Sequence, residues 1–436
     1  NYNSTSSGGR MQPARRSRSS YQNLFRNRSF AALWLGQTVS FLGDYFYFLA
    51  IPIMVNRLTG SALLVGIATI SEALPVLLLG PLAGVFVDRW DRKTTMIVSN
   101  VLRGLLVLLL LLVKTPDQVW IFYLVGFTMS CVSRFFFPAQ NAALPLIVTD
   151  PQDLLSANGL MQAVMTVGLL AGPALAGFTI GLWGSWVAFV FDSASFFIST
   201  AFILTMTIPK SEYRPAAAGT HPLQAVVDEM KEGVIFLFKS PVLAPMMVGM
   251  MVAYFSIGAV NVAWVPYLQR TFNIGAEGLG IVDSAQGVGM LAGGLSLGFL
   301  AARFKKIPMV VAGLALMGLF FVGMGVAPTF GFIIAMSLGI GLALVPVQSV
   351  IATIMQVAVP DEKRGRVGSA VNALAMAAGL VSMSAAAVFG DRFGLRNVYI
   401  ACGLINGLSG LLALWFGREP EAVPAAPIQP APVGND

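Results

Sequence analysis

Apolar stretches of about 20 residues recur along the whole chain, separated by short polar turns. A stretch of this length crosses about 30 Å of hydrocarbon as an α-helix, which satisfies its own backbone hydrogen bonds. The sequence therefore predicts an all-α membrane protein with 12 transmembrane helices. The expected spans are 30–55, 63–87, 96–114, 119–146, 158–181, 187–208, 243–267, 279–302, 308–327, 331–357, 367–390 and 397–416.

A polar segment at 209–242 divides these spans into an N-terminal six-helix half, 30–208, and a C-terminal six-helix half, 243–416. Short motifs recur in the two halves at nearly equal spacing, which predicts two parallel six-helix repeats with a cavity between them. The recurring pairs are Gly84-x-x-x-Asp88-Arg89 with Gly298-x-x-x-Ala302-Arg303, Pro138-Ala-Gln140 with Pro346-Val-Gln348, and Ser156-Ala-Asn158 with Ser369-Ala-Val-Asn372.

The distribution of basic residues predicts the orientation. Most of the 27 lysine and arginine residues fall on the side of the N-terminus, and the other side has Arg57, Lys114, Arg270, Arg392 and Arg396. Basic residues collect in cytoplasmic loops, so both termini and the 209–242 linker are expected in the cytoplasm. Within the linker, a helix from about Leu223 to Phe238 is expected along the membrane surface. Residues 1–29 form a cytoplasmic tail, of which 1–10 is interpreted as a tag or leader remnant, and 417–436 should be disordered.

Composition supports the membrane assignment and excludes several functions. The chain is 56% hydrophobic and 11% charged, with a net charge of +7, whereas soluble domains are about 25% charged. In a membrane protein this charge does not indicate a nucleic-acid partner. A phosphate-binding G-x-x-x-x-G-K-[ST] loop, a metal-binding pair of His or Cys residues and a catalytic Ser/His/Asp set are all missing from the sequence. We expect no enzyme activity, no cofactor and no metal; Cys131 and Cys402 are interpreted as packing residues.

The loop between the second and third spans reads Gly84-Val-Phe-Val-Asp88-Arg89-Trp90-Asp91-Arg92-Lys93. It resembles the signature loop of the major facilitator superfamily, except that Asp91 stands where the family has glycine. The resemblance implies a cytoplasmic latch in which Asp88 caps a helix of the other half. The latch candidates are Gly84, Asp88, Arg89, Arg92 and Lys93. The alternative is that the basic residues only anchor the loop at the inner surface.

The fifth span carries a spaced set of glycines and a proline: Gly159, Gly168, Gly172, Pro173 and Gly177. Taken alone, glycines four positions apart indicate close helix packing, and a proline inside a helix indicates a bend. The whole spacing resembles the antiporter motif of facilitator-family exporters, with Ala176 where glycine is usual. This resemblance implies export.

Four acids and two bases fall inside the spans: Asp44, Glu72, Asp192, Asp283, Arg103 and Arg134. Each unpaired charge at the centre of a helix costs about 2.5–3.5 kcal/mol on insertion scales, so these side chains must face water, pair, or take up protons. Asp44 and Glu72 lie deepest and are predicted to carry the coupled proton. The alternative is a structural pair with Arg103 or Arg134. Asp192 and Asp283 are expected near the external ends of their spans, where water is close.

A substrate cavity is expected between the halves. Aromatic stripes in such a position indicate either a ligand site or helix packing, and Arg134 is a candidate for an anionic group of substrate or lipid. A broad apolar cavity with few polar groups suits amphipathic molecules. The cavity candidates are Phe41, Tyr45, Arg134, Gln140, Tyr254, Asn261, Trp264 and Gln286.

Over residues 24–416 the chain resembles the macrolide-efflux and enterobactin-exporter branch of drug:proton antiporters. The matching segments are Phe30-Ala-Ala-Leu-Trp34-Leu-Gly-Gln37, Leu42-Gly43-Asp44, Phe137-Pro138-Ala139-Gln140-Asn141 and Phe191-Asp192-Ser193-Ala194-Ser195-Phe196. The resemblance implies a monomeric exporter in the bacterial cytoplasmic (inner) membrane that moves drugs or siderophore-like compounds by alternating access and proton antiport. Coupling to Na⁺, a lysophospholipid flippase or facilitator, and a non-transporting membrane sensor are the alternatives.

Overall fold

The computed structural model describes residues 20–87, 89–209, 222–241 and 243–416. The predictions for the 1–19 part of the N-terminal tail, for Asp88 of the latch and for the 417–436 tail lie outside these residues. So does most of the polar part of the linker, 210–221.

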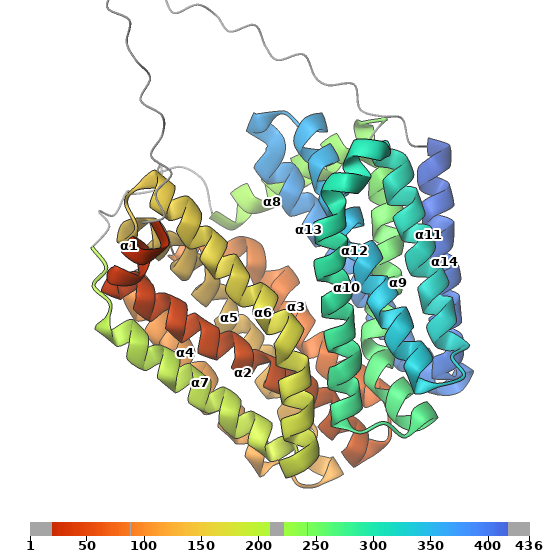
Figure 1. Ribbon diagram of the computed structural model, residues 1–436, viewed down its shortest axis with the longest axis horizontal. Helices are drawn as coiled ribbons and strands as arrows, with labels where there is room; N and C mark the ends of the chain where they lie inside the picture. The colour runs from red at the N-terminus through yellow and green to blue at the C-terminus, as the bar shows by residue number, and fades with distance from the viewer. Residues whose placement is uncertain (1–19, 88, 210–221, 242, 417–436) are drawn as a thin grey trace, which may run out of the picture.

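The described chain is built from long helices arranged as two neighbouring bundles (Figure 1). Eleven helices are long and apolar enough to cross a membrane; α14 completes the second set of six. The N-terminal half contains α2 (Arg28–Thr59), α3 (Ala62–Val87), α4 (Arg92–Leu109), α5 (Trp120–Ile147), α6 (Pro151–Trp183) and α7 (Ser185–Thr205). The C-terminal half contains α9 (Leu243–Phe272), α10 (Ala276–Arg303), α11 (Lys306–Gly325), α12 (Phe330–Ala358), α13 (Arg364–Phe393) and α14 (Leu395–Phe416).

The sequence repeats fall on corresponding helices of the two halves. Gly84 and Gly298 lie near the ends of α3 and α10, and Pro138 and Pro346 lie inside α5 and α12. The predicted fold class is therefore confirmed.

The largest difference from the predicted spans is at α6, which begins at Pro151 and not at 158. The Asp150 side chain caps this helix by accepting hydrogen bonds from the backbone N–H groups of Gln152 (2.8 Å) and Asp153 (3.2 Å). Proline is favourable in the first helical turn, where its missing N–H costs nothing. Hydropathy misses this first part of the helix because Gln152, Asp153 and Ser156 interrupt its apolar residues.

Two shorter helices lie outside the spans. The helix α1 (Ser20–Arg26), which was not predicted, packs against α2 and α6. The linker helix α8 (Pro222–Lys239) agrees with the expected 223–238 helix. It packs against α13, where Arg366 Nη1 donates to Glu232 Oε2 at 2.6 Å.

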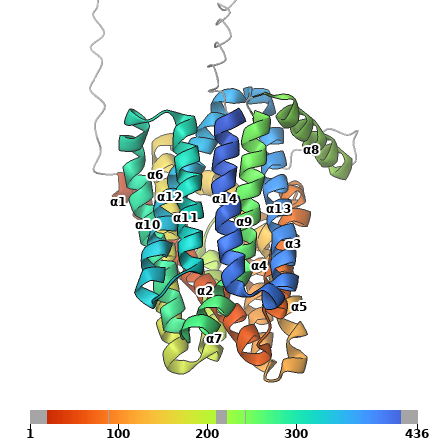
Figure 2. The ribbon, with the colours of Figure 1, turned by 90° about the vertical axis from the view of Figure 1, so that its right-hand side faces the viewer.

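The two halves share a hydrophobic core at one end of the bundle and have separate cores at the other. One core combines residues such as Ile51 and Ile180 with Tyr267 and Leu279. At the other end there are two separate buried clusters. One lies around the starts of α2 and α4 and contains residues of the N-terminal half. The other lies around α8 and the start of α13 and contains residues of the linker helix and the C-terminal half. We call the end with the shared core the network end, after the polar network that joins the halves there. The opposite end, which carries the loop between α3 and α4, is the latch end. The start of α2 and the end of α14 both lie at the latch end (Figures 1 and 2).

Large apolar side chains cover the outer surface, as expected where helices face lipid. Among them, Trp120, Trp183 and Trp186 are exposed, and they lie at the start of α5, the end of α6 and the start of α7. By topology these positions are all at the network end of the N-terminal half.

Candidate functional site

A cavity of about 580 Å³ lies between the two halves. This is within the size range of small-molecule sites, about 300–1,000 Å³. Its walls come from α2, α3, α5 and α6 on one side and from α9, α10 and α13 on the other. The wall is rich in aromatic, aliphatic and methionine side chains, including Tyr47, Phe48, Val76, Met129, Met290 and Met376.

Three carboxyl groups line this cavity: Asp44 on α2, Glu72 on α3 and Asp283 on α10. Glu72 lies against Gly126 of α5, because a Cβ atom at that glycine would be 3.0 Å from Glu72 Cγ and 3.6 Å from the Tyr47 hydroxyl. The cavity therefore contains acidic groups from both halves.

The placement of the other two acids is correct for one and wrong for the other. Asp283 lies nearer the network end of α10, as expected, and lines the central cavity. Asp192 is fully buried, with 0% of its surface exposed, so the expectation that water lies close to it is wrong. The reason is that α7 packs directly on α2 and α4, and the Asp192 face of the helix points into that contact.

Five of the cavity candidates belong to the cavity wall: Tyr45, Arg134, Asn261, Trp264 and Gln286. The other three are placed elsewhere. Phe41 packs against Phe137, with ring centroids 6.2 Å apart, and Gln140 is buried with its Oε1 unpartnered among the described residues. Tyr254 lies on α9, and the cavity lining does not include it.

The glycines of the antiporter motif contact two different neighbours. Gly168 and Gly172 face the Tyr45 ring of α2, and Gly177 faces α10, where a Cβ atom would lie 2.5 Å from Ala276 O. A Cβ atom on Gly280 of α10 would in turn collide with Pro173 O. We call the backbone-to-backbone packing of Pro173 and Gly177 with Ala276 and Gly280 the glycine contact. By contrast, a Cβ atom at Gly159 would meet open space.

A hydrogen bond also joins the halves next to Pro173. Ala174 N, which follows Pro173 in α6, donates to Ser284 Oγ of α10 at 3.1 Å. The glycine contact thus brings the two helices close enough for a backbone group of one half to bond to a side chain of the other.

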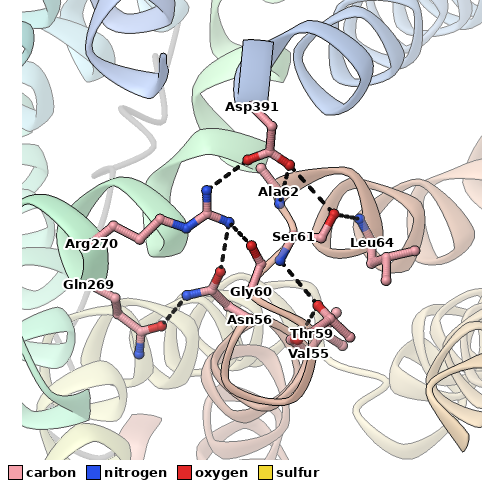
Figure 3. A network of polar contacts seen from close by, with 10 residues as sticks. All are labelled: Val55, Asn56, Thr59, Gly60, Ser61, Ala62, Leu64, Gln269, Arg270 and Asp391. Carbon is pink, nitrogen blue, oxygen red and sulfur yellow. Dashed lines mark hydrogen bonds and ion pairs between the residues drawn. The ribbon is translucent and has the colours of Figure 1, made fainter. Parts of the chain in front are cut away.

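A polar network joins the halves at the network end (Figure 3). Arg270 at the end of α9 donates through Nη1 to Asp391 Oδ1 of α13 (2.7 Å) and through Nη2 to Gly60 O (2.9 Å) and Asn56 Oδ1 (3.2 Å). Asn56 Nδ2 donates to Gln269 Oε1 at 2.7 Å. These bonds connect the end of α2 to the ends of α9 and α13.

Asp391 also caps α3, the helix that follows the turn at Gly60. Its Oδ2 accepts from Ala62 N at the start of α3 (3.0 Å), so a carboxylate of the C-terminal half satisfies a free N–H group of the N-terminal half. Gly60 adopts φ +61, a left-handed conformation in which its carbonyl is free to accept from Arg270. The polar network consists of Asn56, Gly60, Ala62, Gln269, Arg270 and Asp391.

The described part of the latch makes its contacts within the N-terminal half. Lys93 Nζ donates to Leu204 O (2.8 Å) and Met206 O (2.6 Å) at the end of α7. Arg89 is exposed, and Arg92 Nε is buried without a hydrogen-bond partner among the described residues. Asp91 caps α4, because its Oδ1 accepts from Thr94 N at 2.7 Å, which explains how this chain begins the helix without the family glycine. The closing role of the latch stays a prediction.

The polar network was not predicted from the sequence. A signal was present, because Asn56-Arg57 and Gln269-Arg270 occupy corresponding ends of the first helix of each half. The partner Asp391 has no such signal, since it comes from a third helix far along the chain.

Comparisons with known proteins agree with this architecture. The model of the transmembrane secretion effector family matches residues 19–416. The chain is 27% identical to macrolide efflux protein A of Streptococcus pyogenes, over 86% of this chain and 93% of that protein. It is 25% identical to the multidrug efflux pump Tap of Mycolicibacterium fortuitum, over 89% and 94%, and 28% identical to the uncharacterized MFS-type transporter YfiS of Bacillus subtilis, over 90% and 94%.

Solved structures share the fold at low identity. A bacterial homologue of the iron transporter ferroportin, in an inward-facing state, has a TM-score of 0.69 and 16% identity, covering 90% of this chain and 99% of that one. The nucleoside transporter NupG has a TM-score of 0.67 and 15% identity, covering 89% and 98%. These likenesses concern the fold alone. The family match over residues 19–416 shows that this chain belongs to the transmembrane secretion effector family of major facilitator transporters.

Proposed function

We propose that this protein is a secondary active exporter of amphipathic small molecules that works by alternating access and proton antiport. The observation that carries the proposal is the cavity between the halves, which combines an aromatic and methionine-rich wall with the carboxyl groups of Asp44, Glu72 and Asp283. The names of two relatives, a macrolide efflux protein and a multidrug efflux pump, support the substrate class.

The cavity walls suit a substrate with a large apolar body. Tyr45, Phe48 and Trp264 offer flat faces, and the methionines Met129, Met290 and Met376 adapt to different shapes. Asn261, Gln286 and Arg134 add hydrogen-bonding groups to this apolar wall, which suits an amphipathic molecule whose polar groups are few and separated by apolar surface.

Alternating access is supported by the difference between the two ends. At the network end the halves share one hydrophobic core and the polar network, whereas at the latch end each half has its own core. This arrangement fits a state closed at the network end. With the predicted orientation, the cavity would then face the cytoplasm and await substrate.

Proton coupling is assigned to Asp44 and Glu72. Both face the cavity from the N-terminal half, where a carboxyl group can release its proton when substrate or water reaches it. We expect proton release to accompany substrate binding on one side and proton uptake to accompany substrate release on the other.

The test is transport in proteoliposomes loaded with erythromycin, ethidium or a fluorescent lysophospholipid, under an imposed pH gradient and then a Na⁺ gradient. Uphill movement of erythromycin or ethidium that follows the pH gradient, is absent in Asp44→Asn and is normal in Asp117→Asn would support the proposal. Asp117 is an exposed acid in the turn after α4, so Asp117→Asn is a control that makes the same substitution away from the cavity. Movement of the lysophospholipid without any gradient would favour a lipid facilitator, and dependence on Na⁺ would replace the proton by that ion.

A further inference from the structure

A buried carboxyl group lies against the segment of α2 that carries the cavity acid Asp44. Asp192 on α7 is 0% exposed, and neither of its carboxyl oxygens has a hydrogen-bond partner among the described residues. It is pressed against α2, because a Cβ atom on Gly43 would lie 2.8 Å from Asp192 Oδ1. The neighbouring Ser195 hydroxyl donates to the backbone oxygen of Asp192 (2.7 Å) and not to the carboxyl group. An ionised carboxylate in such a place is costly unless a cation balances it.

One buried cation is close to both acids. Arg103 on α4 is 3% exposed, and its guanidinium carbon lies 4.5 Å from the Phe136 ring centroid and 4.3 Å from that of Phe196. It also donates to Asn100 Oδ1. Arg103 lies beside the contact of α4 with α7, because Ser193 Oγ, next to Asp192, donates to Gly104 O at 2.8 Å. The guanidinium is near enough to Asp44 and Asp192 for their charges to act on it, but forms no direct ion pair with either in the described structure.

The other charges near this group lie on the cavity side. Arg134 of α5 is near enough to repel Arg103, and it lines the cavity, where water can solvate it. Glu72 of α3 also lines the cavity and is placed beside the Tyr47 hydroxyl. The group therefore contains the buried guanidinium of Arg103, the buried carboxyl of Asp192 and the half-buried carboxyl of Asp44.

Charge balance determines the protonation of this group. A buried guanidinium can compensate one carboxylate, and a second carboxylate would leave an uncompensated negative charge in a region of low polarity. We propose that Asp44, Arg103 and Asp192 form one proton-binding cluster that holds a single exchangeable proton. Asp192 is its buried member, and Arg103 is the counterion of whichever carboxyl has lost the proton. The inference rests on the proposed antiport and adds a second carboxyl to it.

The position of the cluster gives the proton one entrance. Asp44 lines the cavity and Asp192 does not, so a proton leaves to cavity water from Asp44. All three residues belong to α2, α4 and α7 of the N-terminal half, so the cluster can remain intact while the cavity changes the side that it faces.

The test counts protonated carboxyl groups by infrared spectroscopy of the purified protein in lipid at neutral pH. Asp44→Asn and Asp192→Asn should each remove one protonated carboxyl from the C=O stretching band. In either single variant the remaining acid is ionised, because Arg103 balances its charge. The double variant has neither acid, so it should lose no more protonated carboxyl than either single variant. Asp117→Asn should leave the band unchanged. Additive losses, or a loss in one single variant alone, would overturn the shared proton.

Transport provides the second readout. Asp192→Asn should lose pH-driven accumulation of erythromycin while gradient-free exchange of the same drug continues. If the wild type itself shows no pH-driven transport, the antiport proposal falls, yet the infrared count still decides whether the cluster holds a shared proton. Should Asp192→Asn fail to fold, Asp192→Glu replaces it. That variant keeps a titratable carboxyl, so its protonated band must remain, and loss of the band would count against the cluster.

Discussion

The two halves meet at the network end through two contacts that are equivalent by the internal repeat but differ in chemistry. The α6–α10 contact is made by glycines and backbone atoms, with Gly177 and Gly280 packed against the opposite helix. Its counterpart between α13 and α3 also packs a glycine, Gly66, against Ala387, but adds the cap of Asp391 on Ala62. Asp391 is held in turn by Arg270 of α9, in its own half. The Arg270 and Asp391 side chains are 34% and 36% exposed, so water competes with their interaction. Close backbone packing resists any added atom, whereas an exposed polar network can break and reform at low cost. We therefore expect the glycine contact to fix the geometry and the polar network to tune the equilibrium between states.

The largest effect is expected from Gly280→Ala. The new methyl group would collide with Pro173 O, a backbone atom that cannot rotate away, so the closed state should lose about 1–3 kcal/mol. Transport should fall accordingly, and the network end should open. Gly298→Ala is the matched control on the same helix, because its Cβ atom would meet open space. Equal transport rates in the two variants would refute the role of the glycine contact.

The opening is measurable as a distance. Spin labels on cysteines introduced at the exposed positions Thr115 and Phe393, in a background without Cys131 and Cys402, report on the network ends of the two halves. A longer mean distance in Gly280→Ala, and an unchanged one in Gly298→Ala, is the expected pattern.

Gly172→Ala should have a smaller and different effect. Its Cβ atom would lie 2.6 Å from Cγ of Tyr45 and closer still to Cδ2, so this side chain, which lines the cavity, must shift. We expect a several-fold weaker apparent affinity for erythromycin with little change in the distance between the halves. Gly159→Ala, which adds a methyl group in open space on the same helix, is the control. A changed distance with unchanged affinity would mean that Gly172 belongs functionally to the glycine contact.

Asp391→Asn tests the polar network. It removes a partly exposed ion pair, which is typically worth about 0.2–1 kcal/mol, and weakens the cap on Ala62. The population open at the network end should rise by a factor of a few, as read from the same spin-label pair. Arg392→Gln, at an exposed neighbouring position, should leave the distribution unchanged. If Asp391→Asn shifts the population more than Gly280→Ala does, the assignment of the two contacts is reversed.

Salt should produce the smallest shift. The screening length falls from about 8 Å at 0.15 M to about 3 Å at 1 M, which weakens exposed charge pairs and leaves van der Waals packing unchanged. High salt should therefore favour opening slightly in the wild type and have no further effect in Asp391→Asn. A salt response of equal size in both would place its origin outside the polar network.

The sequence predicted the helices well because burial in lipid requires long apolar runs, and the repeat of Pro138 at Pro346 identified the two halves. It missed the start of α6, where capping by Asp150 and not hydropathy decides the boundary. The depth of Asp44 and Glu72 could be predicted because it follows from their position along a span, and the structure adds that both line the cavity. The burial of Asp192 could not be read in this way, since it depends on which face of α7 meets α2.

The exposed tryptophans at the network end set the depth of the N-terminal half in the bilayer. Tryptophan prefers the boundary between hydrocarbon and headgroups. Trp120, Trp183 and Trp186 hold the network end of the N-terminal half at that depth, whereas the described network end of the C-terminal half has no exposed tryptophan, since Trp264 there is half-buried in the cavity wall. The surrounding bilayer therefore restrains one half more than the other. We expect the tilt that exposes the cavity to be taken up mainly by the C-terminal half, with the lipid-anchored half as its stationary frame.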